Sequence, residues 1–244
     1  MHFVNFFQEN KDCPIFSGLD RDAVECILAH STAASYNKGQ ILVQQGDTPK
    51  YLYFIMSGSL ITFRASKEGA ISAIRLLGKG ETCMDAVIYM DTASPIGVQA
   101  VKNAEILQID SAFVKQYSDE NSVFANNLIR ILAKYYRDAL YQLDGLAIKP
   151  TTQRTGHYLL QNYLSTNSAN FVMPFNRYLV ASHLGMSFET LSRALSIIKD
   201  LGVEIKGSKV ILSDPYALCT FCDEGTEAIC KQKSDQCTSM RIRS

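Results

Sequence analysis

The chain lacks an excess of charge of either sign. Its 244 residues hold 24 Lys and Arg side chains against 24 Asp and Glu, so the net charge is zero with histidine neutral. This balance excludes a basic field over the whole protein as an indication of nucleic-acid binding. Residues 149–212 differ, because they hold seven basic and three acidic side chains and thus a local charge of +4. Such a basic region inside a neutral chain is typical of a protein that touches phosphate in one place.

Long apolar runs and an export signal are also missing. No stretch of 18 apolar residues occurs, so we expect no membrane-spanning helix and no membrane partner. The N-terminal MHFVNFFQENKDC has no basic segment followed by a long apolar core, which excludes a typical signal peptide. Seven cysteines without such a signal are typical of the reducing cytoplasm, where thiols stay reduced or bind metal. We therefore expect a cytoplasmic protein.

Histidine is scarce and catalytic motifs are absent. The four histidines are His2, His30, His157 and His183, and none lies within residues 36–110. A metal-dependent enzyme of the cupin type needs histidines and a carboxylate inside its barrel. No G-x-S-x-G, P-loop or H-E-x-x-H motif appears either. We therefore expect no enzyme, and a cupin-like jelly-roll enzyme is the alternative from a different class.

Residues 36–110 alternate short apolar runs with glycines. The runs lie in KGQILVQQGD, YLYFIMSGSLITFRA, ISAIRLLGKGE and AEILQID. The glycines between them are Gly39, Gly46, Gly58, Gly69, Gly78 and Gly80. Short strands at even spacing with turn signals predict a compact antiparallel barrel or jelly roll.

A long apolar stripe begins near Glu120 and recurs at spacings of three and four residues. The stretch to Gly145 contains neither Gly nor Pro, so it predicts one long helix with a nearly heptad seam. A helix that packs on its own domain would show the same stripe. Because this helix lies between two domains, we favour pairing with a second copy, and hence a homodimer. The expected interface residues are Phe124, Leu128, Ile131, Tyr135 and Leu143.

The pattern after Pro150 predicts three helices and a hairpin. The helices are expected over 152–163, 176–184 and 188–201, with Gly185-Met186-Ser187 as the tight turn between the last two. Ser187 is the expected N-cap of the third helix. Two short β runs then meet at Gly207-Ser208, which favours a hairpin. Helix, turn, helix and hairpin in this order are typical of a winged helix.

These segments resemble one family in the same order along the chain. LVASHLGMSFETLSRALSIIKDLGVEIKGSKVIL (179–212) is similar to the DNA-binding domain of the Crp–Fnr superfamily of transcription regulators. The KG…QGD…SG pattern resembles that superfamily's sensor β-roll, and the long helix lies where its dimerisation helix lies. The resemblance covers residues 15–215 or so. Within the superfamily, GETCMDAVIYMDTASPIGVQA (80–100) is most similar to the dissimilatory nitrate-respiration branch.

The resemblance implies an α+β fold in four parts. We expect a cyclic-nucleotide-binding-like β-roll with flanking helices over 1–118, a dimerisation helix over 119–148, a winged helix-turn-helix over 149–214 and a Cys-rich tail over 215–244. The implied function is sequence-specific transcription regulation, as activator or repressor, with RNA polymerase as a partner.

The third helix carries the candidate DNA contacts. Glu189, Ser192 and Arg193 lie at i, i+3 and i+4, so they share one face of the helix. Arg193 can bind guanine O6 and N7, Glu189 can accept from a cytosine amino group, and Ser192 can contact a thymine. Glu-x-x-Ser-Arg is similar to the triad of the fumarate–nitrate regulators, which implies a palindrome close to TTGAT-N4-ATCAA. Ser187 and Thr190 complete the expected contact set. The alternative is a capping role for Glu189.

The expected effector is not cyclic AMP. The superfamily's cyclic-AMP binders hold the cyclic phosphate with an Arg-Ser/Thr pair, and aligning through AEILQI places Ser94-Pro95 there. Asp85 lies near the position of the family's ribose-binding Glu. Without the arginine, a phosphodiester loses its main charge-assisted partner.

Four of the seven cysteines lie in the last 26 residues: Cys219, Cys222, Cys230 and Cys237. Four thiolates can bind an iron–sulfur cluster or a structural zinc, or they can be inert or disulfide-switching thiols. We favour the cluster, and with it oxygen, nitric oxide or redox state as the signal. Haem or another small molecule in the β-roll is the alternative, with His30 or Cys83 as the candidate axial ligand. A tail cluster would lie beside the DNA-binding domain and could switch its DNA binding.

Overall fold

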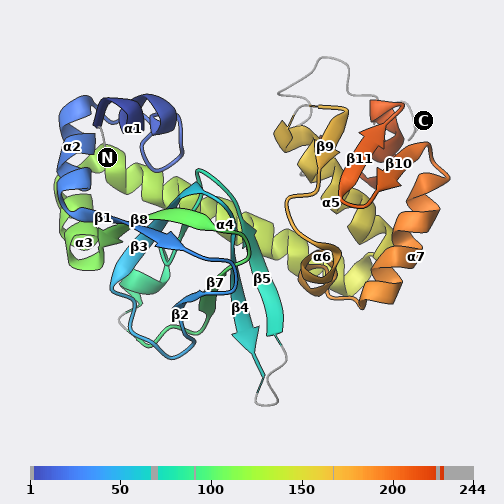
Figure 1. Cartoon of the computed structure of the whole chain (residues 1–244), viewed down its shortest axis with the longest axis horizontal. Helices are drawn as coiled ribbons and strands as arrows, with labels where there is room; N and C mark the ends of the chain where they lie inside the picture. Colours follow the sequence, from blue (N-terminus) through green and yellow to red (C-terminus); the bar gives the residue numbers. More distant parts are fainter. Residues whose placement is uncertain (1–2, 67–70, 91, 167, 224–225, 228–244) are drawn as a thin grey trace. The chain divides into compact units, whose positions relative to one another are not determined.

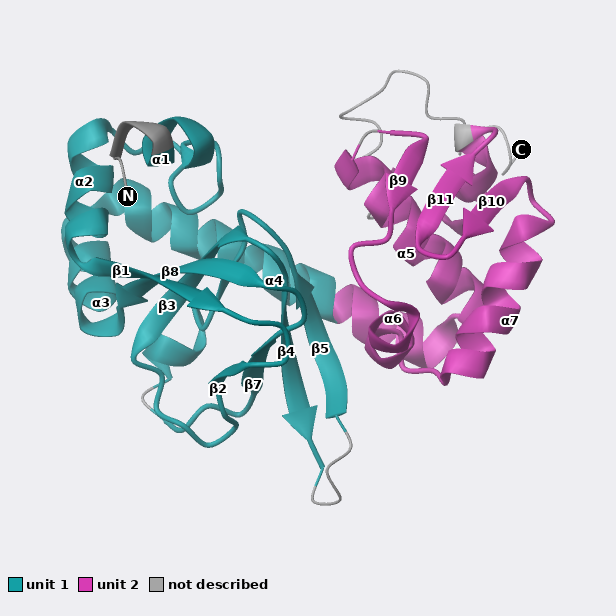
Figure 2. Cartoon of the chain, viewed as in Figure 1, with its two compact units in different colours: residues 1–139 teal, residues 140–244 magenta. Residues whose placement is uncertain are grey.

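The computed structural model describes the chain except residues 1–2, 67–70, 91, 167, 224–225 and 228–244. It divides into two compact units, residues 1–139 and 140–244, each with its own core (Figure 2). The division falls inside the longest helix, α4 (Ser122–Ile148). The four-part division expected above, which rests on function, stays a prediction.

Unit 1 contains two four-stranded sheets whose neighbouring strands are all antiparallel. The first sheet, in spatial order, consists of β1 (Ser31–Tyr36), β8 (Ala104–Asp110), β3 (Tyr51–Ser57) and β6 (Thr82–Cys83). The second consists of β2 (Ile41–Val43), β7 (Gly97–Ala100), β4 (Leu60–Ala65) and β5 (Ile71–Leu77). This arrangement confirms the expected β-roll.

The turn from β3 to β4 shows why a glycine is needed. Gly58 has a φ of +84°, and a Cβ there would lie 2.2 Å from the Asn103 carbonyl oxygen. A side chain at this position would therefore be both strained and blocked by backbone. The glycine lets the loop before β8 lie directly against the turn.

Helices close one end of the two sheets (Figure 1). They are α1 (Phe3–Asn10), α2 (Arg21–Ala29) and α3 (Ser111–Glu120), and a short 3-10 helix, η1 (Val87–Tyr89), follows β6. The ring of Phe16 meets those of Phe6 and Phe54 edge-on, with centroids 5.4 and 5.0 Å away. Edge-to-face packing is a favourable arrangement of aromatic rings, so these three side chains stabilise the core.

Three residues expected at the dimer seam belong instead to the core of unit 1. Phe124, Leu128 and Ile131 are 0, 3 and 6 % exposed, and Tyr135 packs partly buried against the same core. A side chain that the barrel already covers cannot also be covered by a second copy. The expectation for Phe124, Leu128 and Ile131 is therefore corrected, because this stripe is the face of α4 that packs on its own barrel. Tyr135 is only partly covered, so its place in an interface stays a prediction. Leu143 is exposed, so its place in an interface stays a prediction.

Unit 2 has the expected helices and hairpin, with one strand more than predicted. Its core lies between the helices, where Leu159, Leu191, Leu195 and Ile198 are buried. Its elements after α4 are α5 (Thr151–Thr166), β9 (Asn170–Val172), α6 (Arg177–His183), α7 (Phe188–Lys199), β10 (Val203–Lys206), β11 (Lys209–Leu212) and the 3-10 helix η2 (Pro215–Phe221). The strand β9 was not predicted; it pairs with β11 and makes the hairpin a three-stranded sheet. None of the helices in the described ranges is long and apolar enough to cross a membrane.

Candidate nucleic-acid interface and effector site

The turn between α6 and α7 is built from local sequence. Gly185 has a φ of +62°, which glycine adopts without strain, and its missing Cβ leaves room for Leu146 of the same unit. Ser187 then caps α7, because its hydroxyl accepts a hydrogen bond from the Thr190 amide at 3.2 Å. The predicted cap and glycine turn are confirmed.

The structure separates the two faces of α7. Leu191, Ala194 and Leu195 are buried, whereas Glu189 and Arg193 are exposed on the opposite side, with Ser192 between the two extremes. The side chains predicted to contact bases therefore lie toward solvent on one helix.

Glu189 and Arg193 are held by neighbours at the start of α7. Hydrogen bonds from its own backbone amide and from the Ser187 hydroxyl keep the pKa of Glu189 below its usual range, and Arg193 adds to this. Arg193 donates from Nη2 to the Thr190 hydroxyl at 3.4 Å. Glu189 therefore stays ionised as an acceptor, and the capping contact considered from sequence is also present.

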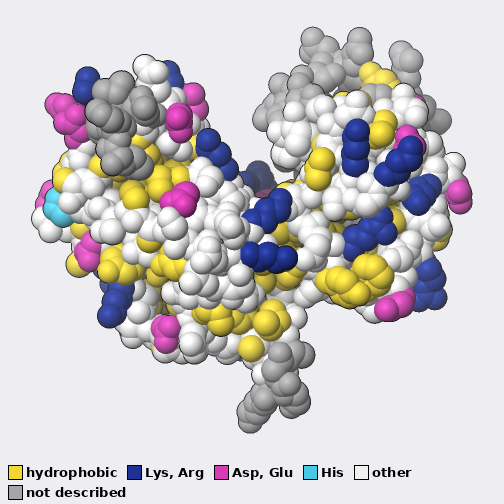
Figure 3. All heavy atoms as spheres, viewed as in Figure 1, with side chains coloured by type: hydrophobic (Ala, Val, Ile, Leu, Met, Phe, Trp, Pro, Cys, Tyr) yellow, Lys and Arg dark blue, Asp and Glu magenta, His cyan; other side chains and the backbone are white. Residues whose placement is uncertain are grey.

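Cations and aromatic rings that sequence reasoning missed surround this helix. Arg177 in α6 donates from Nη2 to the Gly207 carbonyl at 2.9 Å, which ties α6 to the β10–β11 turn. Tyr178 and Phe188 stack, with ring centroids 4.4 Å apart and planes 17° from parallel. In Figure 3 several Lys and Arg side chains and a hydrophobic patch lie on the visible face of this unit. The sequence does show an excess of basic residues in this region and an aromatic residue at the start of each of the two helices. It does not show that the two rings stack, because that contact depends on how α6 and α7 cross.

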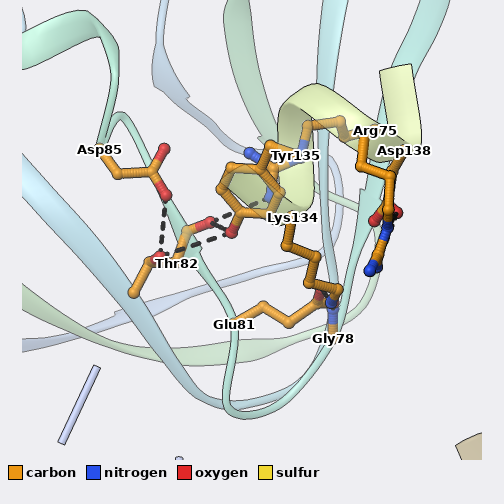
Figure 4. A network of polar contacts seen from close by, with 9 residues as sticks. Arg75, Gly78, Glu81, Thr82, Asp85, Lys134, Tyr135 and Asp138 are labelled. Carbon is orange, nitrogen blue, oxygen red and sulfur yellow. Dashed lines mark hydrogen bonds and ion pairs between the residues drawn. The ribbon is translucent and has the colours of Figure 1, made fainter. Parts of the chain in front are cut away.

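In unit 1 a polar network joins the second sheet to α4 (Figure 4). The Arg75 guanidinium lies 3.3 Å from the ring centroid of Tyr135, in cation–π contact. Both Arg75 Nη2, at 3.3 Å, and the Tyr135 hydroxyl, at 2.8 Å, donate to the Thr82 carbonyl. One carbonyl thus receives a donor from β5 and another from α4.

Asp85, the candidate ribose-binding residue, belongs to the same network. Its buried carboxylate accepts from the Thr82 hydroxyl at 3.0 Å and from the Ala86 amide at 3.1 Å. Burial raises its pKa, although Arg75 and these hydrogen bonds oppose the rise. The chain itself therefore already satisfies this carboxylate.

Ser94 and Pro95, which align with the Arg-Ser/Thr pair of the cyclic-AMP binders, offer no cation for a phosphate. Ser94 is buried, and its hydroxyl donates to the Ile96 carbonyl at 2.7 Å and lies 3.9 Å from the Met84 sulfur. Met84 adopts a φ of +70°, a strained conformation for a residue other than glycine. A strained backbone next to Asp85 marks this region as a candidate effector site.

The segment that follows the β10–β11 hairpin, or wing, packs against α5. We call the contacts of Phe221 and Asp223 described here the clasp. The ring of Phe221 occupies the space above Gly156, where a Cβ would lie 2.2 Å from the ring. Asp223 accepts from Lys149 Nζ at 2.7 Å and lies 3.4 Å from His157 Nδ1. Partial burial raises the pKa of Asp223, but hydrogen bonds from Lys149 and Thr226 outweigh it and lower the pKa to about 2.

Two of the four candidate cluster ligands lie in this clasped segment. Cys219 is in η2 and Cys222 ends it, both partly buried, whereas Cys230 and Cys237 lie outside the described residues. Within the part of the chain that the structure describes, no group of three or more His, Cys, Asp or Glu side chains is placed to hold a metal ion. Burial raises the pKa of Cys83 to about 12, so this thiol is a poor candidate for a haem ligand.

A second apolar face of α4 is exposed. Ile129, Tyr136, Leu140 and Leu143 are 60, 69, 47 and 64 % exposed. They follow one another at seven, four and three residues, which is the spacing of a heptad seam. This face differs from the one that packs on the barrel.

Comparisons with known proteins match both units. Residues 33–121 match the model of the cyclic nucleotide-binding domain, and residues 153–221 match that of the Crp-like helix-turn-helix domain. The Thermus thermophilus protein named cyclic AMP receptor protein is 27% identical over 193 residues, 79% of this chain and 88% of that protein. Transcriptional activator protein FnrA of Stutzerimonas stutzeri is 27% identical over 239 residues, covering 89% and 94%. The structure of FixK2 from Bradyrhizobium japonicum shares the fold, with a TM-score of 0.71 at 18% identity over 79% of this chain and 98% of that one.

Proposed function

Since this chain belongs to the Crp–Fnr family of transcription regulators, we propose that it binds a palindromic DNA site as a homodimer and recognises the bases with α7. The observation that carries this proposal is the exposed face of α7, where Glu189 and Arg193 are hydrogen-bonded within the first turns. FnrA and Anr, relatives that align with 89% and 85% of the chain, are named transcriptional activators, so gene regulation through RNA polymerase is the expected output.

The chemistry of the proposed contacts follows from donors and acceptors. The guanidinium of Arg193 presents parallel N–H donors that match O6 and N7 of guanine, and the carboxylate of Glu189 accepts from the amino group of the paired cytosine. Ser192 contacts the adjacent base pair. Ser187 and Thr190, at the N-terminus of α7, are the proposed phosphate contacts, because helix N-termini favour anions.

Binding to TTGAT-N4-ATCAA tests the proposal. Fluorescence anisotropy of the labelled duplex, with a scrambled duplex of equal composition as control, should give affinity for the palindrome at least 1000-fold tighter, the low end for specific regulators. Equal affinities for the two duplexes would refute recognition of this site.

The proposed dimer uses the exposed face of α4 rather than the buried stripe. Ile129, Tyr136 and Leu143 recur on this face at heptad spacing. A glutamate at Leu143 would place one charge from each copy at the seam without a partner. We expect Leu143→Glu to sediment as a monomer and to lose operator binding, whereas Lys102→Glu, on an exposed loop of the barrel, should remain a dimer. A dimeric Leu143→Glu protein would place the interface elsewhere.

For the signal, we propose an iron–sulfur cluster held by the tail rather than cyclic AMP in the barrel. Two observations support this proposal. Four cysteines follow the wing, and the clasp of Phe221 and Asp223 on α5 holds in place the segment that carries Cys219 and Cys222. When bound, the cluster would supply a centre sensitive to oxygen, nitric oxide or redox state. In the barrel, Ser94-Pro95 supplies no arginine for a cyclic phosphate.

Anaerobic purification with iron, sulfide and zinc analysis separates the alternatives. Iron and sulfide in equal amounts, lost in Cys219→Ser and Cys222→Ser but retained in Cys13→Ser, would support the cluster. Zinc alone would support a structural site, and haem absorption would move the sensor to the barrel. Calorimetric titration with cyclic AMP should show no binding to the wild-type protein.

A further inference from the structure

The stacked pair Tyr178–Phe188 lies at the starts of α6 and α7, and neither ring is fully buried. Tyr178, in the first turn of α6, is 69 % exposed, and Phe188 is the first residue of α7. Their rings lie nearly parallel, 4.4 Å apart. Arg177 precedes Tyr178 in α6, and Arg193 lies on α7 with Phe188, so the two helices that carry the rings also carry cations.

We propose that Phe188 contacts the C5-methyl group of a thymine in the major groove and that Tyr178 positions its ring. The inference rests on the proposed function, DNA recognition by α7. The N-terminal residues of a recognition helix are those that reach base edges, and Phe188 immediately precedes Glu189. A phenyl ring can neither donate nor accept a conventional hydrogen bond, and the only apolar group on a major-groove edge is the thymine methyl. Arginines on the same two helices, Arg177 and Arg193, are suited to the phosphates and guanines near such a base.

Tyr178 acts through Phe188 rather than on the base itself. Stacking covers one face of the Phe188 ring and restricts its rotation, while Phe188 remains only partly buried. A ring fixed before binding loses less side-chain entropy when it meets the methyl group. Tyr178 is therefore a positioning residue, and its ring, not its hydroxyl, is what the contact needs.

Replacing thymine by uracil tests this contact directly, since uracil lacks the methyl group but keeps the hydrogen-bonding edge. Each thymine of the half-site is replaced in turn, symmetrically, in the proposed palindrome or in the best duplex selected from random sequences. We expect one position to weaken binding of the wild-type protein about threefold to fivefold per half-site, as burial of one methyl group implies. Phe188→Ala should bind the thymine and uracil duplexes equally. Thermal unfolding shows whether Phe188→Ala is folded, and Phe188→Leu, an apolar replacement, should keep part of the discrimination.

Variants of Tyr178 separate positioning from simple packing. Tyr178→Phe should keep the thymine–uracil ratio of the wild type, and Tyr178→Ala should reduce it while the protein stays folded. Specific binding by the wild type with no sensitivity to uracil at any position, or equal sensitivity in wild type and Phe188→Ala, overturns the methyl contact and leaves DNA recognition intact. A wild-type protein that prefers no sequence at all overturns both.

Discussion

Arg75 in unit 1 and Arg193 in unit 2 have the same side chain in opposite surroundings. Arg75 lies over the ring of Tyr135 and donates to the Thr82 carbonyl, and its charge opposes the burial that raises the pKa of Asp85. Arg193 is exposed on α7 and makes one long hydrogen bond to Thr190. Arg75 uses one N–H donor and the plane of its guanidinium within unit 1, so it stabilises the junction of barrel and α4. The donors of Arg193 face solvent, so they can be given to a ligand at little cost to the fold.

The largest expected effect comes from removing the exposed arginine. Arg193→Ala removes the proposed bidentate contact to guanine at about 1–3 kcal/mol per half-site, so a dimer loses about 2–6 kcal/mol of operator binding. Its free energy of unfolding should change by less than about 0.5 kcal/mol, as for other surface substitutions. Anisotropy titrations and chemical unfolding measure the two quantities. A large loss of stability would show that this arginine is structural after all.

Removing Arg75 should lower the stability of the protein and leave its DNA binding largely unchanged. Arg75→Ala abolishes a cation–π contact and a hydrogen bond and leaves Asp85 without its neighbouring cation, which should lower the free energy of unfolding by about 2 kcal/mol. Arg75→Lys keeps the charge but not the planar stack, so we expect an intermediate loss. The intrinsic affinity of folded dimers for operator DNA should change far less than in Arg193→Ala. If Arg75→Ala is as stable as the wild type, the structural role that we assign to Arg75 is wrong.

A smaller effect is expected from pH on the free energy of unfolding, through the half-buried carboxylate of Asp223 in the clasp of unit 2. The pKa of Asp223 is lowered to about 2, so the carboxylate stabilises the fold above about pH 4 and this contribution is lost as the pH falls toward 2. Burial lowers the pKa of His157 despite Asp223, so stability also falls as the pH drops below the ordinary histidine value of about 6.5. After allowance for solvent screening, we expect the Asp223 contribution to be about 1 kcal/mol.

Unfolding of wild type and Asp223→Asn between pH 7 and pH 2 measures this contribution. The acid-dependent loss below pH 4 should be smaller in the variant. Asp200→Asn, which alters an exposed carboxylate at the end of α7, is the matched control and should follow the wild type. Parallel curves for Asp223→Asn and wild type would show that the clasp carries no net stabilisation.

Much of unit 2 could be predicted because its signals are local. The N-cap Ser187 and the turn at Gly185 depend on residues within a few positions of one another, and so does the hairpin at Gly207. The strand β9 was missed, since three residues carry little periodicity and pair with β11 some forty positions later. The stacking of Tyr178 on Phe188 was missed for a similar reason: two helices must cross before the rings meet.

The periodicity of α4 shows where sequence reasoning failed. Packing on a barrel and packing on a second helix both require an apolar residue every three or four positions, so Phe124, Leu128 and Ile131 fit either partner. The structure assigns them to the barrel and leaves Ile129 and Leu143 exposed. Which apolar face of α4 packs on the barrel, and which stays exposed, depends on the tertiary packing of the whole unit.

By itself, the sequence determined the order of β-roll, long helix and winged helix, because strand and helix periods, caps and turn glycines act over short distances. Tertiary structure alone decided which face of α4 is covered, how Arg75 reaches Tyr135 and Thr82, and how Phe221 lies over Gly156. Arg75 and Tyr135 are 60 residues apart in the sequence, and Gly156 and Phe221 are 65 apart. The existence of these contacts depends on how whole elements pack, which no local pattern encodes.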